Sequence, residues 1–249
     1  MNEPIGQERV EFETDVIPVL TKAGCNTGAC HGAAIGRGGF ALSLYGGDPE
    51  FDFRSIVRQL KGRRVNRDDA GQSLLLLKAT EAMEHGGGAR LDADSEAANR
   101  IRDWIRLGAR RLDGDRSAPS RRLLKLEVQP KSIVVDDLAQ RVSLNAFAHF
   151  GDGTRRNVSN WTVFEAEDPS SLAVDRETAQ VKVLRRGRHI VIARYLNQVV
   201  PIEILVPLQS QSPFVTADAT ADGIDRHIDQ VIKTLHLPRS STCSDQVFL

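Results

Sequence analysis

The segment Gly24-Cys25-Asn26-Thr27-Gly28-Ala29-Cys30-His31-Gly32 places two cysteines and a histidine within seven residues. Pro18 lies in the apolar run before it and predicts a kink or a helix start. The run predicts a short amphipathic helix that ends at Gly24, with apolar positions Phe12, Val16, Ile17, Leu20 and Ala23. After the motif, the glycine-rich stretch 26–50 predicts a loop. The reactive side chains therefore lie where a helix meets a long loop.

Two thiols followed directly by an imidazole are the grouping that covalent haem attachment requires. Each thiol takes one vinyl group as a thioether, and the adjacent histidine binds the iron. The usual spacing is C-x-x-C-H, whereas four residues intervene here, so a looser loop is needed, which Gly28 helps to supply. Spacing alone leaves three alternatives open. They are a zinc site with a fourth ligand such as His85, a Cys25–Cys30 disulfide, and chance proximity.

The flanking sequence favours the haem interpretation. A class I cytochrome c has a short helix before the attachment motif and a final helix, often aromatic, that packs against the first. The final helix is predicted to begin after Ser95, a good N-cap, and to stop at Gly108. Its apolar side comprises Ala97, Ala98, Ile101, Trp104, Ile105 and Gly108. Shorter candidate helices lie around residues 52–60 and 73–80.

One loop offers two groups for the far side of the iron, since Met83 and His85 both lie in Met83-Glu84-His85-Gly86-Gly87-Gly88. Methionine is the common sixth ligand and raises the reduction potential, while histidine lowers it. The glycines would let the backbone approach the haem edge closely. An open or water-bound sixth position is the remaining alternative.

After a charged linker at residues 113–122, the spacing of apolar residues changes from the helical period to the period of two that is typical of strands. Apolar residues alternate with polar ones in two stretches, Val142, Leu144, Ala146, Ala148 and Phe150, and later Val200, Ile202, Ile204 and Val206. Short strands separated by turns predict an antiparallel β-sandwich over residues 123–208. A helical pattern resumes at Ile224 and ends before Pro238. The abrupt end after it suggests a truncated product.

The charge balance, the lengths of the apolar runs and the motif content exclude several classes of function. Lys plus Arg equals Asp plus Glu at 33 each, which argues against a nucleic-acid partner. No apolar run approaches the roughly 18 residues that span a bilayer. The start lacks a secretory signal, so we expect an export signal to be missing from this chain if haem is attached. No Ser-His-Asp order, phosphate loop or supported carboxylate pair predicts an enzyme, and any catalytic region is expected beyond the C-terminus.

The N-terminal region resembles a known family. The runs GCNTGACHGAAIGRGGFALSLYGGDPEFDF, GRRVN, SLLLLKAT, HGGGAR and WIRLGA look like the cytochrome c-like domain of large planctomycete proteins. Those proteins carry two domains of unknown function near their C-terminal ends. The resemblance covers roughly residues 9–112 and favours His85 over Met83 as the distal ligand, because it includes the histidine before the glycine triplet.

Two further resemblances cover the remainder. LEVQPKSIVV, FGDGTRRNVSNWTVFEAEDPSSLAV and HIVIARYLNQVVPIEILVP resemble a bacterial Ig-like domain of group 2, a β-sandwich used as a spacer or adhesion module. Residues 213–249 are similar to the opening of the first unknown-function domain of the same proteins. Cys243 lies there without a haem-binding partner and is interpreted as structural or incidental.

The predicted architecture is therefore multidomain, α plus all-β, with a small class I cytochrome c-like domain, an Ig-like sandwich and a truncated helical tail. The predicted function is haem-c electron transfer through Cys25, Cys30 and His31, with His85 or Met83 as distal ligand. An exported protein of the periplasm or envelope is implied, with an unidentified redox partner and possible carbohydrate contact. The alternatives are a non-redox envelope or polysaccharide-binding protein with a disulfide or zinc staple, and a haem enzyme such as a peroxidase with an open distal site.

Overall fold

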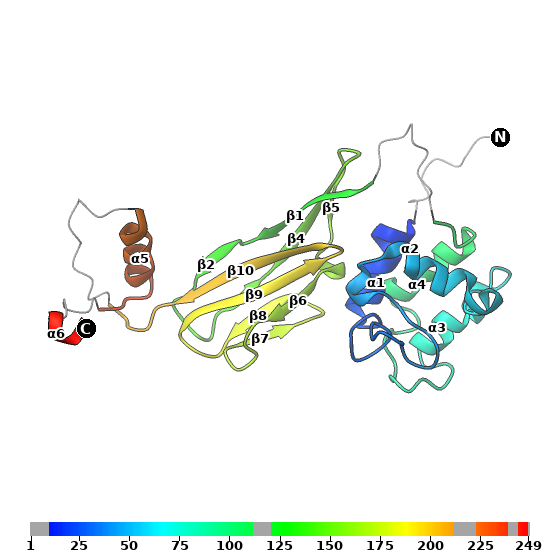
Figure 1. Ribbon diagram of the computed structural model, residues 1–249, viewed down its shortest axis with the longest axis horizontal. Helices are drawn as coiled ribbons and strands as arrows, with labels where there is room; N and C mark the ends of the chain where they lie inside the picture. Colours follow the sequence, from blue (N-terminus) through cyan, green and yellow to red (C-terminus); the bar gives the residue numbers. More distant parts are fainter. Residues whose placement is uncertain (1–9, 112–120, 212–222, 239–243, 249) are drawn as a thin grey trace. The chain divides into compact units, whose positions relative to one another are not determined.

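The computed structural model describes residues 10–111, 121–211, 223–238 and 244–248 (Figure 1). A helical N-terminal part is followed by a β-rich region and then by short helices, as the sequence predicted at this level of detail. The chain forms two compact units. The first comprises Met1–Glu127, Phe147–Val163 and Arg194–Val199, and the second comprises Val128–Ala146, Phe164–Ala193 and Val200–Leu249.

The helical part consists of short helices joined by loops. The predicted helices around residues 12–23, 52–60, 73–80 and after 95 are confirmed. The second begins earlier than predicted, because Asp48 Oδ1 accepts a hydrogen bond from the Phe51 amide and caps it. The elements are η1 (Phe12–Val16), α1 (Ile17–Lys22), η2 (Leu44–Gly46), α2 (Pro49–Phe53), η3 (Arg54–Arg58), η4 (Gln59–Gly62), η5 (Ala70–Gln72), α3 (Leu74–Ala79) and α4 (Glu96–Arg106).

Pro18 marks a helix start, as predicted. It lies in the first turn of α1, where a missing amide hydrogen costs no helical hydrogen bond. The preceding residues form the π-helical turn η1. The chain leaves α1 through Gly24, whose φ of +76° is a left-handed conformation that glycine adopts without strain. The helix therefore ends directly before Cys25.

The first and last helices of this part share one core. Ser95 Oγ caps α4 by accepting a hydrogen bond from the Ala98 amide at 3.2 Å. The buried Trp104 ring lies 5.2 Å from the Phe12 ring of η1, measured between centroids. Arg100 of α4 also forms an ion pair with the buried Asp15 of η1 at 3.3 Å. These contacts hold the segment that precedes the motif against the end of the helical part.

The motif loop folds back on itself through buried backbone contacts. Asn26 is fully buried, its side-chain amide donates to Thr21 Oγ1 at 2.8 Å, and its carbonyl accepts from the Tyr45 amide at 3.1 Å. A Cβ at Gly32 would lie only 2.2 Å from that same carbonyl oxygen. Gly28, in contrast, has only Leu44 at 4.0 Å from a Cβ position. Position 32 therefore requires glycine, and position 28 does not.

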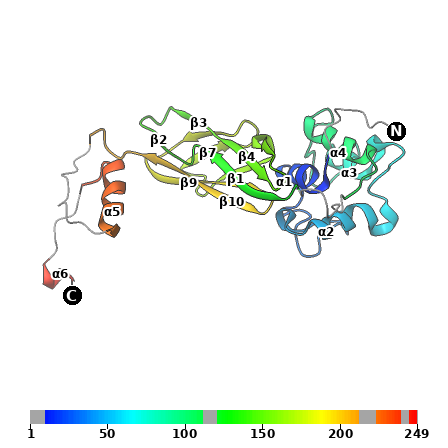
Figure 2. The same ribbon diagram turned by 90° about the horizontal axis from the view of Figure 1, so that it is seen from above.

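The β-rich region shows the predicted alternation of buried apolar residues with more exposed ones. The buried residues are Val142, Leu144, Ala146, Ala148 and Phe150. Its sheets have the orders β1-β4-β5, β2-β10-β9-β6 and β3-β8-β7. Figure 2 shows the long strands β9 and β10 side by side. The strands are β1 (Leu123–Gln129), β2 (Ser132–Val134), β3 (Arg141–Ser143), β4 (Asn145–Phe150), β5 (Arg155–Asn157), β6 (Val163–Ala166), β7 (Leu172–Asp175), β8 (Gln180–Val183), β9 (Gly187–Tyr195) and β10 (Gln198–Val206).

The pairing is antiparallel between β3 and β8, β7 and β8, and β4 and β5. The strand β2 is an exception, since it runs parallel to β10 with Ile133 opposite Ile204. The chain reaches β2 through Pro130, which has no amide hydrogen to continue the ladder of β1. The first strand segment is thereby divided between two sheets.

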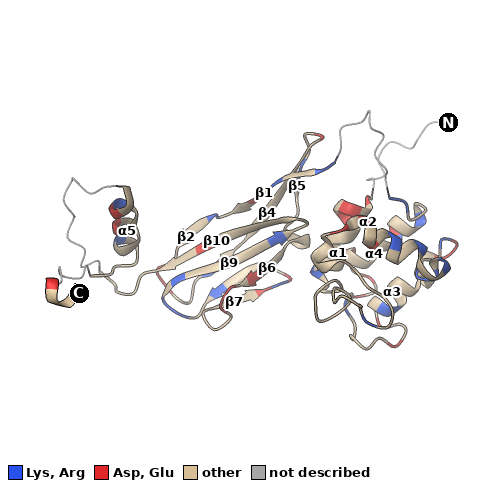
Figure 3. Ribbon diagram, in the orientation of Figure 1, with Lys and Arg blue, Asp and Glu red and all other residues tan. Residues whose placement is uncertain are grey.

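The C-terminal part contains α5 (Gly223–Thr234) and α6 (Asp245–Phe248). The predicted helix that ends before Pro238 is confirmed, although Ile224 and Ile228 on its apolar side are exposed. Residues 213–222 and Cys243 lie outside the described residues. Among the residues that the structure does describe, no helix has both the length and the apolar character to cross a bilayer. Figure 3 shows both signs of charge on the helices and on the strands.

Replacing Gly32 by alanine should destabilise the protein by about 1–3 kcal/mol, because the new methyl group overlaps the Asn26 carbonyl oxygen. Gly28→Ala, in the same loop, is the matched control and should stay within about 0.5 kcal/mol of the parent. Urea unfolding followed by circular dichroism measures both. Equal destabilisation by the two substitutions would contradict the described loop geometry.

Candidate functional site

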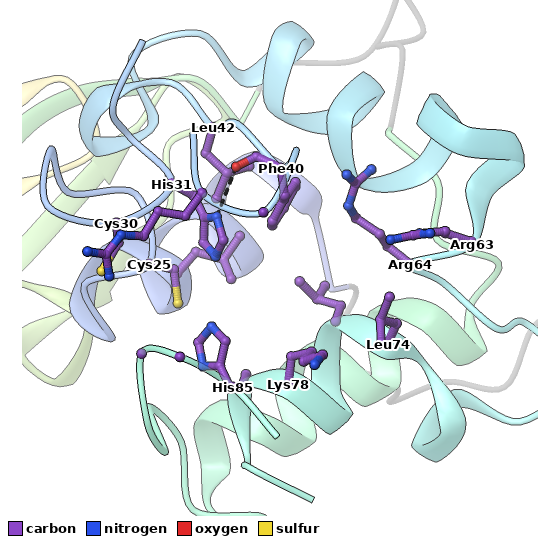
Figure 4. Close-up of a pocket in the computed structure, with 17 residues that line it drawn as sticks. Cys25, Cys30, His31, Phe40, Leu42, Arg63, Arg64, Leu74, Lys78 and His85 are labelled. Carbon is purple, nitrogen blue, oxygen red and sulfur yellow. Dashed lines mark hydrogen bonds between the residues drawn. The ribbon is translucent and has the colours of Figure 1, made fainter. Parts of the chain in front are cut away.

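A cavity of about 550 Å³ opens beside the motif loop (Figure 4). Its volume lies within the range of about 300–1,000 Å³ that is common for small-molecule and cofactor sites. The motif loop, α1, the segment after η4, α3 and the glycine loop all contribute residues to its wall. All of these lie in the first compact unit. The apolar part of the wall comprises Leu20, Phe40, Leu42, Leu74, Leu75 and Ala79.

The three motif residues line this cavity together. The Cys25 amide donates to Leu20 at the end of α1, and the His31 amide donates to the Cys25 carbonyl at 3.0 Å. The loop thus closes between its first cysteine and its histidine. Cys25 and Cys30 are both free cysteines, and the Cys30 Sγ atom lies 3.9 Å from a guanidinium nitrogen of Arg90. The sequence motif is therefore a spatial cluster on one wall.

The His31 ring is held in one orientation. Its Nδ1 atom lies 2.9 Å from the carbonyl oxygen of Phe40, and the two aromatic rings are 4.7 Å apart. A carbonyl only accepts, so Nδ1 carries the hydrogen and Nε2 keeps its lone pair. Burial lowers the pKa of His31, which favours the neutral ring. A histidine whose Nδ1–H is held by a backbone carbonyl is the usual form of a metal ligand.

His85 has the same arrangement on the glycine loop. Its Nδ1 atom lies 2.9 Å from the carbonyl oxygen of Gly88, so its Nε2 lone pair is also available. A Cβ at Gly87 would lie 2.9 Å from the His85 ring, and a larger residue there would displace it. The first glycine of the triplet, Gly86, has no atom within 4 Å of a Cβ position. The glycine at 87 therefore makes room for the histidine.

The two histidine rings point toward each other across the cavity (Figure 4), with centroids 6.2 Å apart and planes 15° from parallel. A metal ion between two imidazoles forms bonds of about 2 Å to each nitrogen, which places the ring centres about 6 Å apart. The separation of His31 and His85 thus fits one metal ion bound on opposite sides. In the described parts of the chain, no group of three or more His, Cys, Asp or Glu residues could hold a metal.

Of the two distal candidates, the structure places His85 in the cavity wall and Met83 outside it. The Met83 side chain is 43% exposed, and its amide donates to the Leu77 carbonyl. Sequence reasoning did not identify the cationic residues that also line the cavity, Arg37, Arg63, Arg64 and Lys78. The only available signal was the adjacent pair Arg63-Arg64, and it lies in a stretch already rich in charged residues. Nothing in the spacing of the other two cations pointed to a shared site.

Comparison with models of known protein families found no match, and no curated protein is significantly similar to this chain.

The two cavity thiols should differ in reactivity. Burial raises the pKa of Cys25 to about 11, so only about a thousandth of it is thiolate at pH 8. In haem-free protein carrying Cys243→Ala, iodoacetamide should modify Cys30 at least about tenfold faster than Cys25. Peptide mass spectrometry over time measures both rates, and labelling in urea should remove the difference. Equal rates in the folded protein would contradict the raised pKa of Cys25.

Proposed function

We propose that the helical part is a c-type cytochrome domain that carries electrons through one covalently attached haem. The observation that carries this proposal is the pair of opposed rings of His31 and His85, each with Nδ1 bonded to a backbone carbonyl. The thiols of Cys25 and Cys30 lie on the same cavity wall as His31.

The donor set favours haem over a zinc staple. A structural zinc ion takes four protein ligands, and although two thiols and two imidazoles line the cavity, no three His, Cys, Asp or Glu side chains of the described residues are placed to share one ion. Two opposed imidazoles alone would leave the remaining ligands to a cofactor. A porphyrin supplies four such nitrogens in one plane, and the predominantly apolar wall suits its faces. The disulfide alternative has less support, since both cysteines are free in the structure.

The residues of this chain have separate roles in the proposal. Each thiol, Cys25 and Cys30, would add across one vinyl group of the haem, with sulfur bonding one carbon and the thiol hydrogen passing to the other, so the addition would need no oxidant or reductant. His31 and His85 would hold the iron through Nε2. Bound haem supplies one-electron redox chemistry. Two histidines set a lower reduction potential than histidine with methionine, and they leave no open position for peroxidase chemistry.

The β-rich region is proposed to be an Ig-like spacer or adhesion module. Its one-sided burial along Val142–Phe150 and its antiparallel pairs support that assignment. Covalent haem attachment normally takes place outside the cytoplasm, so the proposal includes export to the periplasm or cell envelope. A redox partner protein would accept or supply the electron, and polysaccharide is a candidate contact for the β-rich region.

The attachment test uses the full chain, produced with an added export signal and a cytochrome maturation system. Haem peroxidase staining of a denaturing gel should reveal covalent haem, and the optical spectrum should show the bands of a six-coordinate iron without the far-red charge-transfer band of methionine ligation. Replacing both Cys25 and Cys30 by alanine should abolish the stain, and Cys243→Ala should not. Absence of stain in the parent protein would overturn the proposal.

The distal ligand is tested by two substitutions on the same loop. His85→Ala should open one iron position and increase carbon monoxide binding at least about tenfold. Met83→Ala is the control and should behave like the parent, because Met83 lies outside the cavity wall. Soret-band titration of the reduced proteins measures binding. A response to Met83→Ala alone would assign the distal position to methionine instead.

A further inference from the structure

Four cations line the cavity, Arg37, Arg63, Arg64 and Lys78, and no carboxylate lies among its lining residues. A wall made only for an apolar molecule would need none of them. Within the described part of the chain, none of the four forms an ion pair with Asp or Glu. The cavity therefore carries positive charge that this part of the protein leaves unbalanced.

Arg64 is the decisive member of this group, because it is only 5% exposed. Its guanidinium donates to the carbonyls of Ser55 at 2.8 Å and Gly39 at 3.0 Å, and lies 4.3 Å from the centroid of the Phe40 ring. These partners are neutral, so they orient the cation without cancelling its charge. A buried charge without a counter-charge is strongly unfavourable.

The charge of Arg64 is disfavoured by its surroundings as they stand. Burial lowers the pKa of Arg64, and the neighbouring Arg63 charge lowers it further. An anion between the two guanidinium groups would relieve both effects at once. Arginine also binds carboxylates through paired hydrogen bonds, which suits a carboxylate-bearing ligand.

The position of these cations matches the chemistry of haem. Figure 4 shows Arg63 and Arg64 on the side of the cavity away from Cys25 and Cys30, and Lys78 on α3 between His85 and these arginines. The two vinyl groups of haem lie on one half of the macrocycle, and its two propionates lie on the opposite half. Thioethers at the cysteines would therefore direct the propionates toward the arginines.

We propose that Arg63, Arg64 and Lys78 form a carboxylate-binding subsite that receives the two haem propionates. The proposal rests on the haem function inferred above. Arg64 is the inner contact, held by Ser55 and Gly39, while Arg63 is exposed at the rim. Lys78 donates to the Glu84 carbonyl, so the same ammonium group also contacts the loop that carries His85. The subsite would orient the cofactor and balance the buried charge of Arg64.

The test measures the reduction potential of the matured holoprotein between about pH 5 and pH 8. In the parent, the cations should keep the propionates ionised, so the potential should be nearly independent of pH. The other titratable groups that line the cavity do not interfere. The cysteines are thioethers, both histidines bind iron, and Arg37 stays charged.

Arg64→Gln should lower the potential at pH 8 by about 59 mV, a tenfold change in the one-electron equilibrium, because a cation near the iron is lost. It should also make the potential rise as the pH falls, since a propionate now takes up a proton. Arg63→Gln should give the same pH dependence with a smaller shift, and Arg63→Lys should restore the parent profile. Arg67→Gln, outside the cavity wall, is the control and should change neither.

Exposed Arg63 keeps the test valid if Arg64→Gln fails to fold. The subsite would be overturned if the variants carry covalent haem but their reduction potential stays independent of pH, in Arg63→Gln and in Arg64→Gln where it folds. The haem function would then still stand. Matured protein that carries no covalent haem would overturn the proposed function itself, and the subsite with it.

Discussion

The contact between Gly32 and the Asn26 carbonyl is the constraint on which the site depends. It closes the motif loop so tightly that no side chain fits at position 32, and the buried Asn26 side chain ties that loop to Thr21 of α1. Cys25 and His31 are then joined by a backbone hydrogen bond rather than by sequence proximity alone. With four residues between the cysteines, a flexible loop would scatter the thiols and the imidazole, whereas this closed loop keeps them on one wall.

A second constraint acts on the imidazoles themselves. Backbone carbonyls of Phe40 and Gly88 each hold one Nδ1 atom, so main-chain atoms set the direction in which each ring points. The loop conformations fix these backbone partners. Gly87 contributes because a side chain at that position would collide with the His85 ring. The placement of the two imidazoles therefore follows from the turns of the two loops that carry them.

The sequence predicted the local elements well and the assembled site only in part. Helical spacing around Ile17, the Ser95 cap and the alternation around Ala146 are short-range signals, and the structure contains the corresponding helices and strands. The parallel pairing of β2 with β10 was missed, because a crossover at Pro130 depends on contacts distant in the sequence. Arg64 was missed for the same reason, since its burial arises from Ser55, Gly39 and Phe40. The resemblance favoured His85 over Met83 as the distal candidate, but spacing alone does not specify the backbone path that places His85, and not Met83, in the cavity wall.

The closed motif loop has a stereochemical consequence. A flat macrocycle with different substituents on its two halves can enter a slot with either face toward a given wall, and loosely held porphyrins form mixtures of such isomers. Cys25 and Cys30 occupy fixed positions around a closed loop, so His31 would contact only one face of a macrocycle attached to both. If both thiols anchor a haem and His31 binds its iron, as proposed, the rigid loop defines one handedness, and every molecule of the protein would present the same haem face to His85.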